Sequence, residues 1–195
     1  MRSKLNQLVT VFLLCSGSIL WASCDKIKDA ASKDVVVKSI KVNIDDVTVG
    51  SVLRAGLRAG SEEPQLSSFS ASRTLKFSEL EGMSDDIKKY DPSHFKVISV
   101  GESSLVVTPV EGHGTVVKNF SIVAGTLSYN VASYTFGDTY SDSGLVLFTF
   151  ELLEQIRKAK DGVLVTVKGE TDVPDGEHVN VKLTLNNVTF NISLF

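Results

Sequence analysis

The hydrophobic and polar positions of this chain alternate as they do in short β-strands. Residues 35–44 are rich in β-branched side chains, and residues 68–77 alternate apolar and polar positions, which suits a strand with one covered face. We expect further strands of this kind at residues 47–53, 95–100, 104–110, 115–123, 126–136, 145–150, 163–168, 178–185 and 188–194.

Helix and turn signals are fewer. Residues 84–90 predict a short helical turn with Ser84 as its N-cap. Residues 151–160 predict the one convincing helix, because three of its apolar residues share a face and Asp161-Gly162 follows. We expect strands 115–123 and 126–136 to pair around Ala124-Gly125. We expect two further hairpins, one through Gly101-Glu102-Ser103 and one at the chain's end through Asn186-Asn187, which tolerate left-handed backbone angles.

These elements predict an all-β fold, mostly antiparallel, with one inserted short helix. The strand spacing favours an immunoglobulin-like or fibronectin-like sandwich, and a partly open barrel is the alternative. No repeat of fixed period and no domain boundary interrupts residues 35–195, so we expect a single β-sandwich domain there.

The first 23 residues have the pattern of a signal peptide. Arg2 and Lys4 give a positive start, and residues 8–20 form an apolar run of about a dozen residues. That run is shorter than the roughly 20 apolar residues that a membrane-spanning helix needs. Ala22 and Ser23 then precede Cys24, so residues 1–23 are expected to be removed.

Small residues before a cysteine, at the exit of an apolar run, resemble the lipobox of bacterial lipoproteins. The resemblance implies cleavage before Cys24, attachment of lipid (palmitate among the acyl chains) at that residue, and anchoring in the bacterial cell envelope. We expect the lipid anchor to lie in the outer membrane. The sequence leaves open whether the domain lies in the periplasm or on the cell surface. Polar residues 24–34 are then a tether, and an ordinary secretory signal is the alternative interpretation.

Composition narrows the class of partner. The 195 residues include 20 Lys and Arg against 23 Asp and Glu, and the net charge is −3. Cleavage would remove two cations and leave 18 against 23, or −5. A chain without a basic surplus is not expected to bind nucleic acid. Cys15 would leave with the signal, so a single cysteine and no intrachain disulfide are expected in the mature chain.

Catalytic and metal-binding motifs are missing from the sequence. It has no Gly-x-Ser-x-Gly, no His-x-x-x-His or Cys-x-x-Cys spacing and no phosphate-binding glycine motif, so we predict no catalytic residue, metal site or cofactor. His94, His113 and His178 have unremarkable neighbours and are interpreted as exposed histidines. Whether loop 137–144 binds calcium is left open, because its spacing differs from the twelve-residue calcium loop.

The same polar loop supplies the best candidates for ligand contact. Tyr140 stands at its predicted tip, flanked by Asp138 and Asp142. We therefore predict an anchored, non-catalytic binding or structural module for a protein or glycan. The alternatives are an accessory enzyme of envelope or glycan metabolism and an assembly subunit that pairs through an edge strand.

Overall fold

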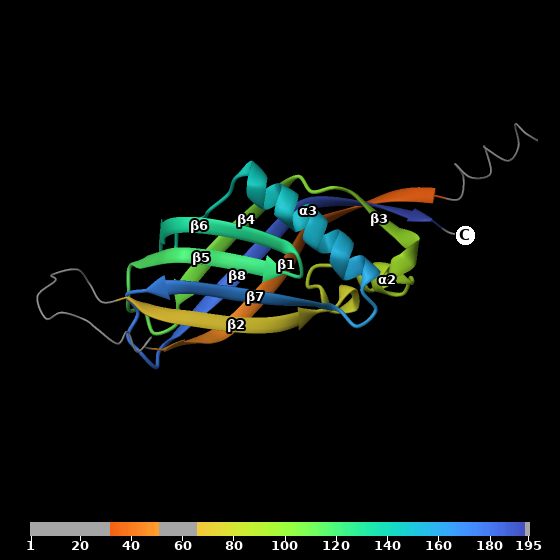
Figure 1. The fold of residues 1–195 in the computed structure, drawn as a ribbon. Coiled ribbons are helices and arrows are strands. Elements are labelled where there is room, and N and C mark those ends of the chain that lie inside the picture. The colour runs from red at the N-terminus through yellow and green to blue at the C-terminus, as the bar shows by residue number, and fades with distance from the viewer. Residues whose placement is uncertain (1–31, 51–65, 194–195) are drawn as a thin grey trace, which may run out of the picture.

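The computed structural model describes residues 32–50 and 66–193, which form one antiparallel sheet with a long helix beside it (Figure 1). The elements are β1 (Ser32–Gly50), β2 (Ser67–Leu75), η1 (Phe77–Glu79), α2 (Asp85–Lys88), η2 (Pro92–His94), β3 (Phe95–Ser99), β4 (Glu102–Pro109), β5 (Val116–Ala124), β6 (Leu127–Thr135), α3 (Ser143–Lys158), β7 (Val163–Thr171) and β8 (His178–Ser193). Within these described ranges, none of the helices has the length and apolar character needed to cross a membrane.

Strand β8 is the centre of one half of the sheet. It pairs with β1 along nearly its whole length, and on its other side with β4 and then β3. The second half runs β2–β7–β5–β6, and every pairing is antiparallel. The two halves are joined where the end of β1 meets β2, through the pairs Val49↔Phe69 and Gly50↔Ser68.

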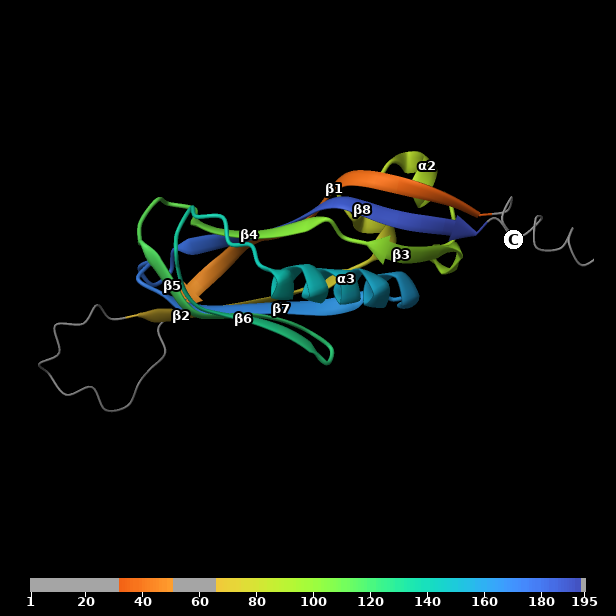
Figure 2. The same ribbon diagram turned by 90° about the horizontal axis from the view of Figure 1, so that it is seen from above.

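The sheet curls at this junction into a half-barrel. Figure 2 shows the β1–β8–β4 half and the β2–β7–β5–β6 half as two layers that diverge from the β1–β2 junction. Helix α3 contacts β3 and β4 on one side and β6 on the other, so it covers the open side of the half-barrel. Its buried face is Leu145, Phe148, Thr149, Leu152, Leu153 and Ile156.

The core fills the space inside the curl. Along β8 the inward positions alternate with outward ones, as a strand with one covered face requires. Phe95 and Phe190 are almost fully buried and meet edge-on at 5.9 Å between ring centroids, and Phe77 packs on both. Each buried aromatic side chain of this size contributes about 1.5–3 kcal/mol through removal of apolar surface from water.

The expected class is confirmed, but the sandwich is not. The fold is mostly antiparallel β with one inserted helix, and its continuous curled sheet matches the alternative of a partly open barrel. Immunoglobulin-like or fibronectin-like features are not confirmed. The reason is the length of β1, whose nineteen residues bend from one half of the sheet into the other.

The helix is longer than predicted, and the expected strand at residues 145–150 is wrong. Helix α3 spans Ser143–Lys158, because Asp142 caps its first turn and accepts a hydrogen bond from Leu145 N–H at 2.6 Å. The apolar run 145–150 and the helical face after it have one common spacing of three and four residues. Read alone, that run is short enough to be mistaken for a buried strand.

The hairpins predicted at Gly101-Glu102-Ser103 and at Asn186-Asn187 are wrong as well. The C-terminal segment is one continuous strand, β8, in which Asn187 has the left-handed φ of 52° without reversing the chain. The long partner β1 pairs with both parts of β8 and keeps it extended. Strands β3 and β4 pair in succession with β8 instead of with each other, and Gly101 N–H donates to the Asn186 carbonyl between them at 3.0 Å.

Other local predictions agree with the structure, including strands 68–77 and 163–168, the paired strands 115–123 and 126–136, and the turn capped by Ser84. Strand β1 begins at Ser32, so the last three residues of the predicted tether 24–34 pair with β8. Cys24 and the predicted signal peptide lie outside the described residues.

Candidate functional site

The predicted contact residue Tyr140 lies along the edge of β4. Its N–H donates to the Leu105 carbonyl at 2.9 Å, and Leu105 N–H donates to the Tyr140 carbonyl at 2.8 Å. Its half-buried ring meets the Tyr129 ring edge-on, with centroids 6.3 Å apart. Tyr140 therefore completes the edge of the sheet, and ligand contact through it stays a prediction.

Asp142 joins Tyr140 to the start of α3. One carboxylate oxygen accepts the Leu145 N–H, and the other accepts the Tyr140 hydroxyl at 3.1 Å. The hydrogen bond from Leu145 lowers the pKa of Asp142. Asp138 is exposed, and its N–H donates to the Thr135 carbonyl at 3.2 Å in a turn. The three candidates thus lie on one short segment, and two of them are in contact.

Beside this segment lies an unusual buried hydroxyl. Burial raises the pKa of Tyr129, and its oxygen has no hydrogen-bond partner among the described residues. Burial also raises the pKa of Tyr134 to about 12, but this hydroxyl is bonded to both backbone groups of Val107 on β4. Tyr134 thus ties strand β6 across the open side of the half-barrel.

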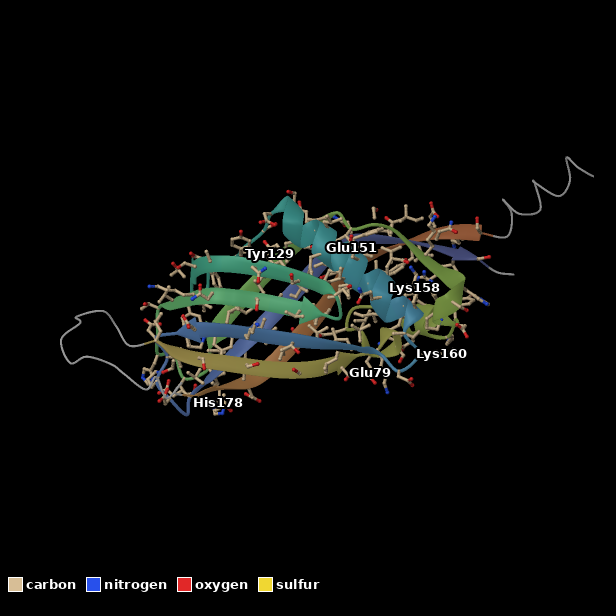
Figure 3. All side chains as sticks on the ribbon, viewed as in Figure 1. Glu79, Tyr129, Glu151, Lys158, Lys160 and His178 are labelled. Carbon is tan, nitrogen blue, oxygen red and sulfur yellow. The ribbon has the colours of Figure 1, made fainter. Side chains whose placement is uncertain are left out.

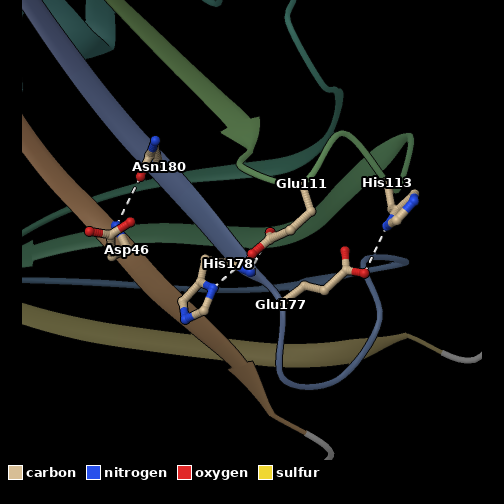
Figure 4. Close-up of polar contacts among 6 residues, drawn as sticks. All are labelled: Asp46, Glu111, His113, Glu177, His178 and Asn180. Carbon is tan, nitrogen blue, oxygen red and sulfur yellow. Dashed lines mark hydrogen bonds and ion pairs between the residues drawn. The ribbon is translucent and has the colours of Figure 1, made fainter.

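Two of the three histidines lie at one end of the molecule, each against a glutamate. His113 Nδ1 is 2.7 Å from Glu177 Oε1, and His178 Nδ1 is 2.9 Å from Glu111 Oε1 (Figure 4). In each pair, one residue lies in loop 110–115. The other lies in loop 172–177 or at the start of β8, which follows that loop. We call Glu111, His113, Glu177 and His178 the histidine end.

The contacts of the histidine end hold the two loops together. His178 N–H also donates to Glu111 Oε2 at 2.9 Å, and the hydrogen bonds from His178 lower the pKa of Glu111. Asp172 accepts the N–H and hydroxyl of Thr115 and the N–H of Val116, between 2.7 and 3.0 Å. His94 is far from these groups, because η2 leads into β3, which pairs with the opposite end of β8.

Within residues 32–50 and 66–193, no three His, Cys, Asp or Glu side chains are arranged to hold a metal ion. The histidine end and the segment with Asp138 and Asp142 both lie within these residues. Their carboxylates bind protein N–H, O–H and imidazole groups instead, where such contacts are shown.

A groove of about 430 Å³ opens at the other end of the molecule, where α3 ends. Figure 3 places Lys158 and Lys160 beside Glu79 at this end, with His178 at the far one. We call it the basic groove, and its lining residues are Lys76, Phe77, Ser78, Asp91, Pro92, Ser93, Arg157, Lys158, Ala159 and Lys160.

One wall of the basic groove is stiffened by Glu154. The Arg157 guanidinium donates to both Glu154 oxygens at 3.0 and 2.8 Å, and Lys158 Nζ is 3.0 Å away. Val97 N–H of β3 donates to the same carboxylate at 2.9 Å. Burial alone would raise the pKa of Glu154, but these donors lower it to about 2. Arg157 and Lys158 are therefore already paired.

Two other lysines of the groove are freer. Lys76 Nζ is 3.9 Å from Glu79 and half-exposed, an ion pair that contributes little in water. Lys160 is exposed, and its charge adds to a hydrogen bond from Ser93 in lowering the pKa of Asp91 in the same groove lining. Asp91 is the one acid in the lining; the hydrogen bond from Ser93 N–H, at 2.8 Å, lowers its pKa and keeps it ionised.

The sequence did not reveal this groove, because its residues come from segments 76–78, 91–93 and 157–160. The available signal was the basic cluster at residues 157–160, which favours the end of a helix by itself. Lys76 is brought to the same place by the pairing of Leu75, at the end of β2, with Val163, at the start of β7 and just after the connection from α3.

No protein-family model and no curated protein matches this chain. Among solved structures, it is similar to a family 29 carbohydrate-binding module from Piromyces equi, with 10% identity over 83% of this chain and 91% of that chain. The TM-score is 0.17, so the similarity carries no argument about fold or ligand.

Proposed function

We propose that the protein is a lipid-anchored module of the bacterial cell envelope that binds an anionic glycan or an acidic protein segment, without catalysing a reaction. The observation that carries the proposal is the basic groove. Its volume of about 430 Å³ lies within the usual range of ligand pockets, and four cationic side chains line it. Lysines that line a concave surface attract anions even when the whole chain is acidic.

The anchor in this proposal rests on the sequence around Cys24. Eight residue steps separate Cys24 from Ser32, which span at most about 28 Å when extended. Strand β1 begins at the same end as the C-terminal end of α3 (Figures 1 and 3). In the proposed anchored protein, the groove therefore lies at the end nearer to the lipid, in a membrane that we take to be the outer membrane, and the histidine end lies at the opposite end.

The assembly alternative finds less support at the β3–β4 edge. Glu154 accepts the Val97 N–H, Tyr140 pairs with Leu105, and Tyr134 binds Val107. Side chains and a bridging segment thus occupy backbone groups that another subunit's strand would need. The accessory-enzyme alternative would have to use the histidine–glutamate pairs, which join two loops and do not line the groove.

Metabolic labelling of the producing bacterium with an alkyne analogue of palmitate tests the anchor. We expect the label on the wild-type chain and on Cys15→Ala, which is the matched control, and its loss in Cys24→Ala. A Cys24→Ala chain that keeps the label would overturn the proposed anchor, whatever the groove binds.

Retention on a phosphorylated glucan (phosphocellulose), compared with unmodified cellulose, tests the binding site. Exchange of Lys76 and Lys160 for Gln should weaken retention about tenfold, since hydrogen bonds to charged groups are among the stronger ones. The control exchanges Lys168 and Lys182, two exposed lysines outside the groove, for Gln. Equal loss of retention in both double variants would mean that the overall surface charge, and not the groove, causes the binding.

A further inference from the structure

The basic groove offers lysine ammonium groups rather than a free guanidinium. Both donor arms of Arg157 shown in contact are taken by Glu154, at 3.0 and 2.8 Å. A ligand carboxylate would seek such a planar, two-pronged edge, but the Nε–Nη2 edge of Arg157 is taken by Glu154 and the Arg157 side chain is only 12% exposed. Lysines act as point charges without such a planar requirement, and they are common binders of phosphate.

The two freer lysines come from two neighbouring segments of the chain that are packed tightly together. Lys76 follows β2, and Lys160 precedes Gly162 in the connection from α3 to β7. At Gly162, a Cβ atom would lie 2.7 Å from the Leu75 carbonyl oxygen and 3.0 Å from Lys76 Cγ. This close approach holds the two segments that carry the lysines side by side, and both lysines line the same groove.

The remaining lining residues can contact hydroxyl groups and carbon atoms of a ligand in addition to its anionic group. Asp91 is an acceptor with one oxygen on Ser93 N–H, so it can accept a hydrogen bond from a ligand hydroxyl. Ser78 and Ser93 add hydroxyl groups that donate or accept. Pro92 and Ala159, both half-buried, add a small apolar surface that can contact a carbon skeleton.

We propose that the basic groove binds the phosphate ester of a small polyol, of which glycerol phosphate is the simplest form. Lys76 and Lys160 bind the phosphate oxygens, and Asp91 accepts a hydrogen bond from a neighbouring hydroxyl. This inference rests on the proposed function and names its ligand class. The ligand is either a soluble phosphate ester or the headgroup of a phospholipid such as phosphatidylglycerol.

The position of the groove makes the headgroup a realistic source. At most about 28 Å of chain separates the proposed lipid from β1, and the groove shares that end of the molecule. Anionic headgroups act electrostatically over a Debye length of about 10 Å at 0.1 M salt. A tether of this reach allows the groove to touch the bilayer.

Calorimetric titration of the full chain carrying Cys24→Ala tests the ligand class. We expect glycerol phosphate to bind more tightly than inorganic phosphate, and glucuronate to bind most weakly. The Gln exchange of Lys76 and Lys160 should weaken glycerol phosphate about tenfold or more, and the Gln exchange of Lys168 and Lys182 should not. In Asp91→Asn, the advantage of glycerol phosphate over inorganic phosphate should shrink severalfold.

Vesicle flotation of the same protein separates the two sources. Greater capture by vesicles with phosphatidylglycerol than by phosphatidylcholine alone, with the excess lost in the Lys76 and Lys160 variant, supports the headgroup. Titration with glycerol phosphate but no excess capture supports a soluble ester. Excess capture that the groove variant retains would overturn the headgroup as the groove's ligand.

The outcomes also separate this inference from the proposed function. Glucuronate bound in the groove as tightly as glycerol phosphate would overturn the phosphate inference and leave the binding module standing. If no anion binds the groove, both fail. If palmitate labelling of Cys24 fails while glycerol phosphate binds, only the anchor is lost.

Discussion

The two ends of the molecule use charge in different ways. At the histidine end, each imidazole is matched to one glutamate, and the partners of each pair belong to different segments. At the basic groove, one glutamate binds both Arg157 and Lys158. Among the described residues, Lys76 and Lys160 have only weak electrostatic partners, Glu79 and Asp91. At the histidine end, one-to-one pairs of opposite charge hold two loops together. At the basic groove, the excess of positive charge leaves hydrogen-bond donors for a ligand.

The two ends also differ in how tightly their connecting glycines are packed. Substitution of these glycines is expected to have the largest effect on the free energy of unfolding. Gly162 and Gly176 have nearly equal left-handed φ angles of 88° and 87°. A Cβ at Gly162 would be 2.7 Å from the Leu75 carbonyl oxygen, but at Gly176 nothing lies within 4 Å. Gly162→Ala should lower the free energy of unfolding by about 2–5 kcal/mol, and Gly176→Ala by about 1–2 kcal/mol from φ alone.

Urea denaturation of the two variants measures this difference. Gly162→Ala should also weaken anion binding, because it moves the segment that carries Lys160 away from Lys76. Gly176→Ala controls for the φ strain alone. Equal destabilisation by both variants would contradict the close packing of the two segments that carry Lys76 and Lys160.

How much of this fold the sequence could predict depends on how local each signal was. The alternation in β2 and the cap at Ser84 are read within a few residues, and both predictions are confirmed. Asn187 shows the limit of such signals. Its residue type correctly indicates a positive φ, but the long partner strand β1 decides that the chain goes straight on.

The candidate site was harder to predict from the sequence, because the topology of the sheet brings its residues together. Pairing Pro109↔Val179 brings the loop after β4 beside the start of β8, which creates the Glu111–His178 contact from residues 67 positions apart. The groove likewise needs three separate segments. Tyr140 and Asp142 were recognisable as neighbours, but the cap of α3 was hidden because the helix start itself was read as a strand.

A matched pair of glutamates gives the next largest effect. The side chains of Glu154 and Glu177 are 18% and 22% exposed, and one lies at each end of the molecule. Glu154→Gln keeps an acceptor for Val97 N–H but releases Arg157 and Lys158, so anion affinity should rise by up to about fivefold. Stability at neutral pH should fall by about 1–3 kcal/mol. Glu177→Gln should leave anion affinity unchanged.

The pH dependence sharpens this prediction. The pKa of Glu154 is lowered to about 2, from an ordinary value of 4.5. Its ionised form therefore stabilises the fold above about pH 4.5, and this contribution disappears as the pH falls toward 2. The stability difference between wild type and Glu154→Gln, followed by thermal unfolding, should shrink over that interval. A difference that stays constant would show that the lost charge is not its cause.

The smallest effect is expected at Glu111. Hydrogen bonds from His178 lower the pKa of Glu111, so its ionised form adds stability above the ordinary value of 4.5, and this is lost as the pH falls through the lower folded value. Glu111→Gln should remove that contribution, and added salt should reduce the difference because the pair is well exposed to solvent. Thermal unfolding at neutral and acid pH measures it. Since the groove lies at the other end and none of its lining comes from these loops, glycerol phosphate affinity should not change. A change in that affinity would mean that the two ends are coupled, and the histidine end would then regulate the groove rather than only hold two loops.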